Sequence, residues 1–196
     1  MRKLWWTLAT LVVGAVLAVG PARAQNVSCT GTLPAGSYTN VTVPAGQFCT
    51  VNNAVTVAGN VTVGTGATLY VPAANFVVNG TILGTKAANV DFLLPVTIGA
   101  NISLTGTTNY IQIESSFIGG ALSVINSTAS AINVLKNNVA ASVLFRDNTT
   151  SGAGSDVISG NTIGGSLLCT GNAPAPTDSG IPNVVGGNKV GQCTGL

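Results

Sequence analysis

The stretch Asn40-Val-Thr-Val43 returns about twenty residues later, letter for letter, as Asn60-Val-Thr-Val63. Written in lines of about twenty residues, the chain adds five variants of this four-residue unit: Gly80-Thr-Ile-Leu83, Asn101-Ile-Ser-Leu104, Ala121-Leu-Ser-Val124, Ala141-Ser-Val-Leu144 and Gly165-Ser-Leu-Leu168. A repeat of this length indicates a solenoid, in which each turn buries its apolar side against its neighbours.

Within each unit apolar and polar residues alternate, as in Val55-Thr-Val57 and Ile111-Gln-Ile113. This period of two is typical of β-strands with one buried face. Gly, Asn and Pro separate the short strands and supply the turns. We therefore expect an all-β, parallel solenoid of about seven coils near 20 residues each, with Val61 and Val63 pointing inward. Larger fillers of the core would be the phenylalanines, Phe48, Phe76, Phe92, Phe117 and Phe145.

The first 24 residues have the three parts of a secretory signal peptide. Arg2 and Lys3 are basic, residues 4–20 are uncharged and apolar, and Ala22-Arg-Ala24 ends the segment with small residues at the cleavage positions. A retained membrane helix is the alternative, but the apolar run is shorter than the roughly 20 residues that a bilayer span needs. We expect a signal peptide at 1–24 and a single mature domain at 25–196, with an N-terminal cap and first coil at 25–50 and a C-terminal cap at 165–196.

Removal of the signal peptide changes the charge of the chain. Three of its seven Lys and Arg residues lie in the first 24 residues, so four cations remain against five carboxylates. The basic patch that nucleic acids or anionic lipids require is therefore not expected. We predict no nucleic-acid partner and no membrane partner for the mature form.

Four cysteines remain in the mature chain, and an even number in an exported protein indicates disulfides. Three pairings are possible. We favour Cys29–Cys49 and Cys169–Cys193, because these pairs close short loops at the two ends of a fold with sequential contacts. A metal site is the alternative, but the chain has neither histidine nor a C-x-x-C spacing. We expect no metal and no other cofactor.

The repeat resembles that of right-handed parallel β-helix proteins of the pectate-lyase-like type, over roughly residues 36–170. The two ends are similar to those of a group of uncharacterised bacterial secreted β-helix proteins. The residues that carry this likeness are Cys29-Thr-Gly31, Tyr38 to Gly46 with Cys49, Cys169-Thr-Gly-Asn172, Pro182-Asn183 and Gly191-Gln-Cys193. The resemblance implies a right-handed coil and secretion, and it implies no activity.

Enzymatic β-helices act on polysaccharides with paired carboxylates, or with an aspartate cluster and a base. The five carboxylates here are scattered, and the aspartate-rich motifs of those enzymes do not occur. The candidates are Asp91 with Glu114, on adjacent coils, and Glu114 with Arg146 and Asp147, on one face. The alternative is that they are solvated turn residues, with Arg146 and Asp147 a weak local pair. We assign no catalytic residue.

Hydroxyl residues recur about every twenty positions and would form one outward column: Thr42, Thr62, Thr81, Ser103, Ser123 and Ser142. Such a column could bind a glycan or ice, but Thr and Ser also simply suit exposed strands. Ice-binding solenoids show two neighbouring threonine columns, which the sequence lacks. Sugar binding commonly uses exposed aromatic rings, and the mature chain has only three tyrosines and no tryptophan.

These observations favour a secreted or cell-envelope-associated structural or interaction protein that is not an enzyme, with a cell-wall glycan or a surface protein as its partner. A carbohydrate-binding or polysaccharide-degrading β-helix is the alternative, and ice binding is a minor one. The long irregular segment 171–183 is expected to be an end-cap loop, with a recognition loop as the alternative.

Overall fold

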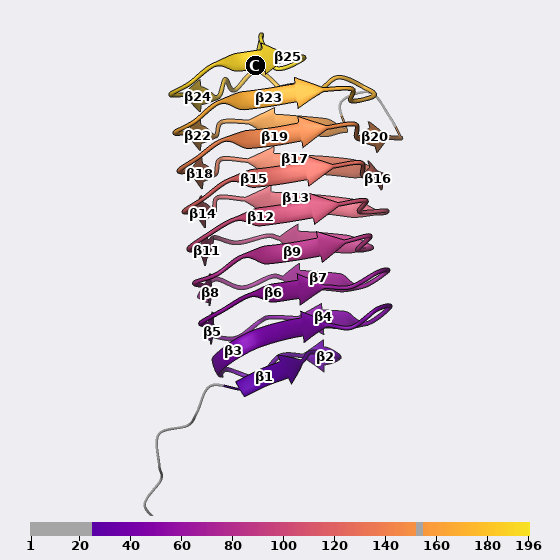
Figure 1. The fold of residues 1–196 in the computed structure, drawn as a ribbon, viewed down its shortest axis with the longest axis vertical. Coiled ribbons are helices and arrows are strands. Elements are labelled where there is room, and N and C mark those ends of the chain that lie inside the picture. Colours follow the sequence, from indigo (N-terminus) through magenta and orange to yellow (C-terminus); the bar gives the residue numbers. More distant parts are fainter. Residues whose placement is uncertain (1–24, 152–154) are drawn as a thin grey trace, which may run out of the picture.

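The computed structural model describes residues 25–151 and 155–196, so the signal peptide expected at 1–24 lies outside the described residues. The described residues form an all-β parallel solenoid of about eight turns, where the sequence predicted about seven. In Figure 1 the front strands run to the right and the back strands return behind them as the chain rises, so the coil is right-handed. Within residues 25–151 and 155–196 no helix is long and apolar enough to cross a membrane.

Three ladders of parallel strands make the walls of the coil (Figure 1). The front ladder contains β1 (Gln25–Ser28), β3 (Gly36–Val43), β6 (Val61–Val63), β9 (Ile82–Thr85), β12 (Ile102–Thr105), β15 (Leu122–Ile125), β19 (Val143–Arg146), β23 (Leu167–Thr170) and β25 (Lys189–Gly191). The back ladder contains β2 (Gly31–Thr32), β4 (Phe48–Thr50), β7 (Thr68–Val71), β10 (Asn89–Phe92), β13 (Tyr110–Glu114), β17 (Ala131–Leu135) and β21 (Asp156–Ser159).

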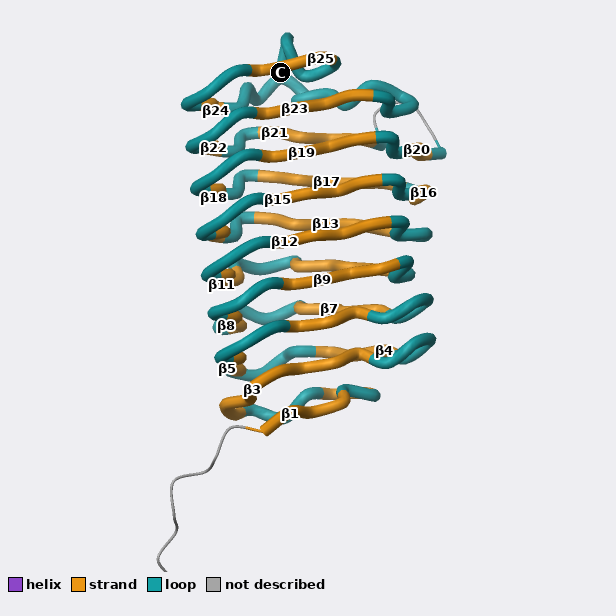
Figure 2. Tube along the Cα trace, in the orientation of Figure 1, coloured by secondary structure: helices purple, strands orange, loops and turns teal. Residues whose placement is uncertain are grey.

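The side ladder is made of shorter strands at the left edge of Figure 1. It contains β5 (Val55–Val57), β8 (Phe76–Val78), β11 (Val96–Ile98), β14 (Phe117–Ile118), β18 (Asn138–Val139), β22 (Thr162–Ile163) and β24 (Val184–Val185). A separate pair, β16 (Thr128–Ala129) and β20 (Thr149–Thr150), lies at the opposite corner. Figure 2 shows that most loops lie at the corners between ladders, so strands form the flat faces of most turns.

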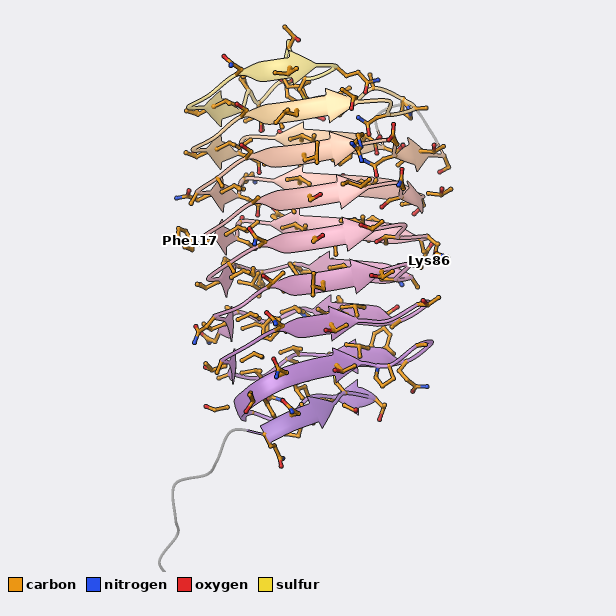
Figure 3. All side chains as sticks on the ribbon, in the orientation of Figure 1. Lys86 and Phe117 are labelled. Atoms are coloured by element: carbon orange, nitrogen blue, oxygen red, sulfur yellow. A yellow bond between two sulfur atoms is a disulfide. The ribbon has the colours of Figure 1, made fainter. Side chains whose placement is uncertain are left out.

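Alternation along each strand sends every second side chain into a continuous apolar core. Val61 and Val63 are fully buried, as the sequence predicted, and Phe76, Phe92 and Phe145 fill the core as expected. Phe48 and Phe117 do not: they are 52% and 46% exposed. Each precedes the inward residue of its strand, so alternation directs its ring to solvent. Figure 3 shows Phe117 projecting from the side ladder.

The register between turns differs by one residue from a simple alignment of the repeat. Val61 lies opposite Ile82 rather than Thr81, and Leu122 lies opposite Val143 rather than Ser142. The solenoid turns from Val61 to Ile82 and from Leu122 to Val143 each advance 21 residues, whereas those from Val41 to Val61 and from Ile82 to Ile102 advance 20. A shift of one residue moves a side chain to the other face of a strand, so the outward column has to be read from the structure.

Buried asparagines form two stacked ladders at the corners, which the sequence analysis did not predict. One contains Asn137, Asn161 and Asn183, and the other contains Asn148 and Asn172 and ends at the half-buried Gln192. In the first, the Asn161 side chain accepts from the Asn137 backbone N–H at 2.8 Å and donates to the Val134 carbonyl at 2.8 Å.

The corner geometry explains why these amides point inward. A residue with positive φ precedes four of the five ladder asparagines: Lys136, Asp147, Gly160 and Gly171 stand before Asn137, Asn148, Asn161 and Asn172. A left-handed residue turns the chain sharply, so the following side chain faces the interior. The ladder then provides hydrogen-bond partners to buried backbone groups that the turn leaves without strand partners.

The two ends are closed by the expected disulfides. Cys29 is bonded to Cys49 and Cys169 to Cys193, with Cα–Cα distances of 5.4 and 5.2 Å. Strand pairing already begins at Gln25, whose strand β1 lies beside β3, and it continues to β25 beside β23. Segment 171–183 follows the coil path, because Ala173 and Thr177 form bridges to Thr149 and Val157. Two disulfides are typical of a protein in an oxidising compartment.

Candidate functional site

An aromatic stripe crosses the outer face of the back ladder. Phe48, Tyr70 and Tyr110 come from β4, β7 and β13, and each alternates with a buried neighbour that holds its strand in place. The register places Tyr70 opposite Asp91, and Tyr110 opposite Asn89. The rings of Phe48 and Tyr70 lie 6.3 Å apart between centroids, tilted by 45°. Three rings therefore share one flat face of the solenoid.

The rings enclose a shallow hollow of about 240 Å³, which we call the Asp91 hollow. Its lining is Phe48, Thr68, Tyr70, Asn89, Asp91 and Tyr110. Asn89 donates to the Thr68 hydroxyl at 2.9 Å, and its side-chain oxygen accepts from Asn109 at 2.8 Å. The amide is therefore held in one orientation before any ligand arrives.

Asp91 is the charged group of this hollow. Its Oδ1 atom is buried and accepts no hydrogen bond from the described residues. Burial raises the pKa of the Asp91 carboxyl above its usual range. Both ion pairs within residues 25–151 and 155–196 involve other carboxylates, Glu114 and Asp147. Asp91 is thus a carboxylate without a cationic partner on the described chain.

A hydrogen-bonded chain of side chains borders the hollow. The Tyr110 hydroxyl donates to Gln112 Oε1, Gln112 Nε2 donates to Glu114 Oε2 at 3.1 Å, and Asn133 Nδ2 donates to the Tyr110 hydroxyl oxygen at 3.1 Å. Lys136 Nζ lies 3.9 Å from Glu114 Oε1. The result is a row of oriented polar groups beside the aromatic stripe.

A second hollow of about 300 Å³ lies farther along the same face. Its lining includes Asn133, Leu135, Lys136, Val157 and Ile181. Asn133 therefore belongs both to this hollow and to the hydrogen-bonded chain. The back face carries two hollows joined by fixed polar groups, in a line along the solenoid axis.

The structure brings only some of the predicted candidates together. Asp91 and Glu114 do lie on adjacent strands, because Asp91 pairs with Gln112 and Glu114 is two residues farther along β13. Strand geometry puts their Cα atoms about 8 Å apart. Arg146 and Asp147 lie at the end of β19 in the front ladder, on a different face from Glu114. They form a local pair at 3.3 Å, and Asp147 is the left-handed corner residue before Asn148.

The hydroxyl column of the front ladder is shorter than predicted. Thr42, Thr62, Ser103 and Ser123 are in register, but Leu83 interrupts them and Leu144 ends the run. Thr81 and Ser142 lie instead at the corner that precedes the strands. The six-member hydroxyl column inferred from the sequence was therefore wrong, because two of its members lie one residue out of register.

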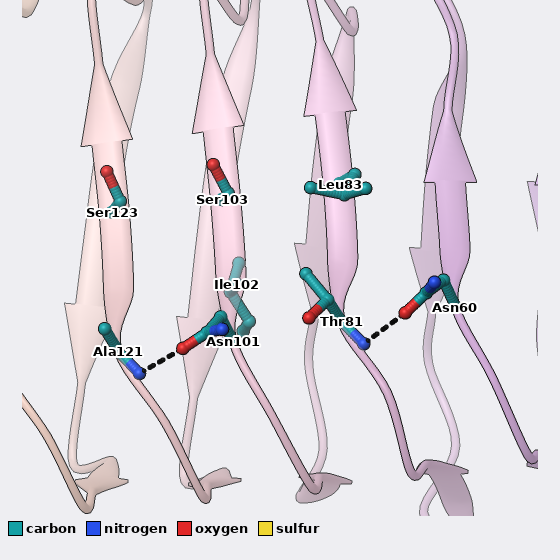
Figure 4. Close-up of a pocket in the computed structure, with 8 residues that line it drawn as sticks. All are labelled: Asn60, Thr81, Leu83, Asn101, Ile102, Ser103, Ala121 and Ser123. Carbon is teal, nitrogen blue, oxygen red and sulfur yellow. Dashed lines mark hydrogen bonds between the residues drawn. The ribbon is translucent and has the colours of Figure 1, made fainter.

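A hollow of about 500 Å³ does lie on this front face (Figure 4). Asn60 and Asn101 border it, but their side-chain oxygens accept from the backbone N–H groups of Thr81 and Ala121 at 2.8 Å (Figure 4). Its lining has no aromatic and no charged residue. It is larger than the Asp91 hollow, but it offers a ligand fewer specific contacts.

Sequence reasoning missed the aromatic stripe although a signal for it existed. Tyr70 and Tyr110 are separated by two repeat lengths, and both stand at outward positions of alternating strands. Phe48 was placed in the core, so only scattered tyrosines remained. No group of three or more His, Cys, Asp or Glu residues that could hold a metal occurs in the part of the chain that the structure describes.

Comparison with known proteins gives no relative: no family model, no curated protein and no solved structure matches this chain.

Proposed function

We propose that this protein is an exported, non-catalytic interaction protein that binds a polysaccharide chain along the outer face of its back ladder. The single observation that carries the proposal is the aromatic stripe of Phe48, Tyr70 and Tyr110 beside a row of oriented amide and carboxylate groups. Aromatic rings stack on the apolar faces of sugar rings, and fixed polar groups exchange hydrogen bonds with the hydroxyls.

The rigidity of the face favours this role. Every side chain involved stands on a strand that is hydrogen-bonded to the turns above and below it. Binding then orders few protein groups, and this lowers the entropic cost of association. Two hollows in line along one face suit a linear chain with repeating units better than a single small molecule.

The carboxylate arrangement favours binding over hydrolysis. Asp91 and Glu114 project from the same face of one sheet. A glycosidase uses one of its two carboxyl groups as the acid and the other as the base or nucleophile. Glu114 is held by Gln112 and Lys136, so it is not free to take either role beside Asp91.

The location outside the cytoplasm rests on two features. The signal sequence at 1–24 would direct export, and two disulfides suit an oxidising environment. Together with the resemblance to bacterial secreted β-helix proteins, these features support a place at the cell envelope, where a wall glycan would be the partner.

Co-sedimentation with insoluble polysaccharides tests the proposal. Residues 25–196 should be retained on at least one of cell wall, chitin, cellulose and pectin. Tyr70→Ala should lower the affinity by about three- to tenfold, the loss expected for one stacked ring. Phe117→Ala is the matched control, because it removes an exposed ring from the side ladder. Tyr110→Phe keeps the stacking surface and removes the hydroxyl, so it measures the hydrogen-bonded chain alone.

Failure of the mature protein to bind any of the four materials would reject the proposal. A structural role as a stiff, weakly charged rod, or an interaction with a surface protein, would then stand. Equal losses for Tyr70→Ala and Phe117→Ala would also count against it, because binding would not depend on the back face.

A further inference from the structure

Within the proposed polysaccharide-binding face, on which this inference rests, we infer that the Asp91 hollow is a subsite for a protonated amine, so the preferred glycan carries free amino groups. Three aromatic rings and one carboxylate are the groups that complement an organic cation. The argument depends on how Asp91 differs from the other acidic residue of the face.

The carboxylates of Asp91 and Glu114 have different surroundings. Glu114 accepts from Gln112 at 3.1 Å and lies 3.9 Å from the Lys136 ammonium nitrogen, so the protein already compensates its charge. Asp91 has no such cation among the described residues, and its buried Oδ1 accepts no hydrogen bond there. A ligand cation at the open side of this carboxylate would provide the missing compensation.

The walls of the hollow reinforce a preference for positive charge. Phe48, Tyr70 and Tyr110 line it together with Asp91. Aromatic ring faces carry negative electrostatic potential and attract ammonium groups, most strongly where water is partly excluded. A neutral hydroxyl would donate a hydrogen bond to Asp91 but would gain nothing from the rings beyond ordinary contact.

The same charges disfavour acidic sugars. A uronate carboxylate in this hollow would meet Asp91 directly and Glu114 one strand away. Like charges in a partly buried site repel each other. The face should therefore rank an amine-bearing glycan first, neutral glycans second and polyuronates last.

Three β-1,4-linked hexasaccharides that differ only at one ring position test the preference for an amine over neutral groups. Titration calorimetry of residues 25–196 would use the hexamer of glucosamine, the hexamer of N-acetylglucosamine and the hexamer of glucose. These present an ammonium, an amide and a hydroxyl at the same site. We expect the glucosamine hexamer to bind about tenfold more tightly than the other two, as an ion pair combined with cation–π contacts would provide.

Two variants separate the subsite from general charge attraction. Asp91→Asn should remove the preference, so that the three hexamers bind with affinities within about threefold of one another. Asp147→Asn makes the same charge change at a corner of the front ladder and should leave the preference intact. Far-ultraviolet circular dichroism would establish that both variants are folded.

The possible outcomes distinguish this inference from the proposed function. If the three hexamers bind equally, or if Asp91→Asn keeps the preference, the amine subsite is wrong and polysaccharide binding stands. If Asp147→Asn removes the preference as fully as Asp91→Asn, the attraction is nonspecific and the subsite is likewise rejected. If none of the hexamers and none of the insoluble glycans binds, the proposed function itself fails.

Discussion

Asp156 places a carboxyl group inside the core, and its replacement by Asn tests the energetics of the fold directly. The residue stands on β21 at an inward position, in register with Ile132 on the turn below. It is fully buried, and neither carboxyl oxygen accepts a hydrogen bond from the described residues in good geometry. Burial raises the pKa of Asp156 to about 6, and the nearby Thr150 hydroxyl offsets only part of that rise.

The direction of the pH effect follows from proton binding. Between the ordinary pKa of 3.8 and the folded value of about 6, the native protein holds a proton that the unfolded chain has released. The free energy of unfolding therefore falls as the pH rises through this window, and the full penalty is present above it. A pKa difference of this size corresponds to about 3 kcal/mol.

Asp156→Asn keeps the shape of the neutral acid and removes the ionisation. At pH 4 the variant and the wild type should have similar stabilities, since both side chains are then mostly neutral. At pH 7.5 the variant should be more stable by about 3 kcal/mol, which is about 6–12 °C in melting temperature for a chain of this size.

Urea unfolding followed by circular dichroism at pH 4, 5, 6, 7 and 8 measures the effect. Asp178→Asn, in a mostly exposed stretch, makes the same chemical change outside the core and is the matched control. Equal pH dependence in the wild type and in Asp156→Asn would show that Asp156 does not titrate as its burial implies. A variant that is less stable than the wild type at pH 7.5 would refute the reasoning altogether.

Three further predictions concern the solenoid itself. Replacing both Val61 and Val63 with Asp should abolish folding, because two charges would enter the core; Thr62→Asp, which points outward on the same strand, should stay soluble and β-rich, and a soluble double variant would overturn the register. Asn148→Ala should lower the free energy of unfolding by about 3–5 kcal/mol, because the buried Ser127 N–H and the Val124 carbonyl lose the side-chain amide as their partner; a loss below about 1 kcal/mol in urea unfolding would show that the ladder contributes little to stability. Mass spectrometry of the protein purified from an oxidising compartment should find no free thiol, and removal of the Cys29–Cys49 bond should cost about 3 kcal/mol; an unchanged melting temperature would count against its role as an end closure.

The sequence by itself determined the fold class and the inward face of most strands. A repeat near twenty residues admits few architectures, and alternation in Val61-Thr-Val63 or Ile111-Gln-Ile113 leaves one apolar face to bury. The order of the cysteines also pointed to bonds at the two ends, because a solenoid brings residues about one turn apart into contact.

Only the tertiary structure decided which residues share a face across turns. The lengths of the solenoid turns vary by one residue or more, and a shift of one residue exchanges the two faces of a strand. Thr81 and Ser142 therefore lie outside the hydroxyl column, and Leu83 lies within it. Phenylalanine is stable in a core and tolerated on a surface, so its type did not show that Phe48 would join the tyrosines. Asparagine is an ordinary turn residue in sequence, and four of the five ladder asparagines are directed inward by a residue with positive φ before them. The candidate site depends on these register and corner details. They arise from contacts between residues about twenty positions apart, and such contacts form only after the chain has coiled.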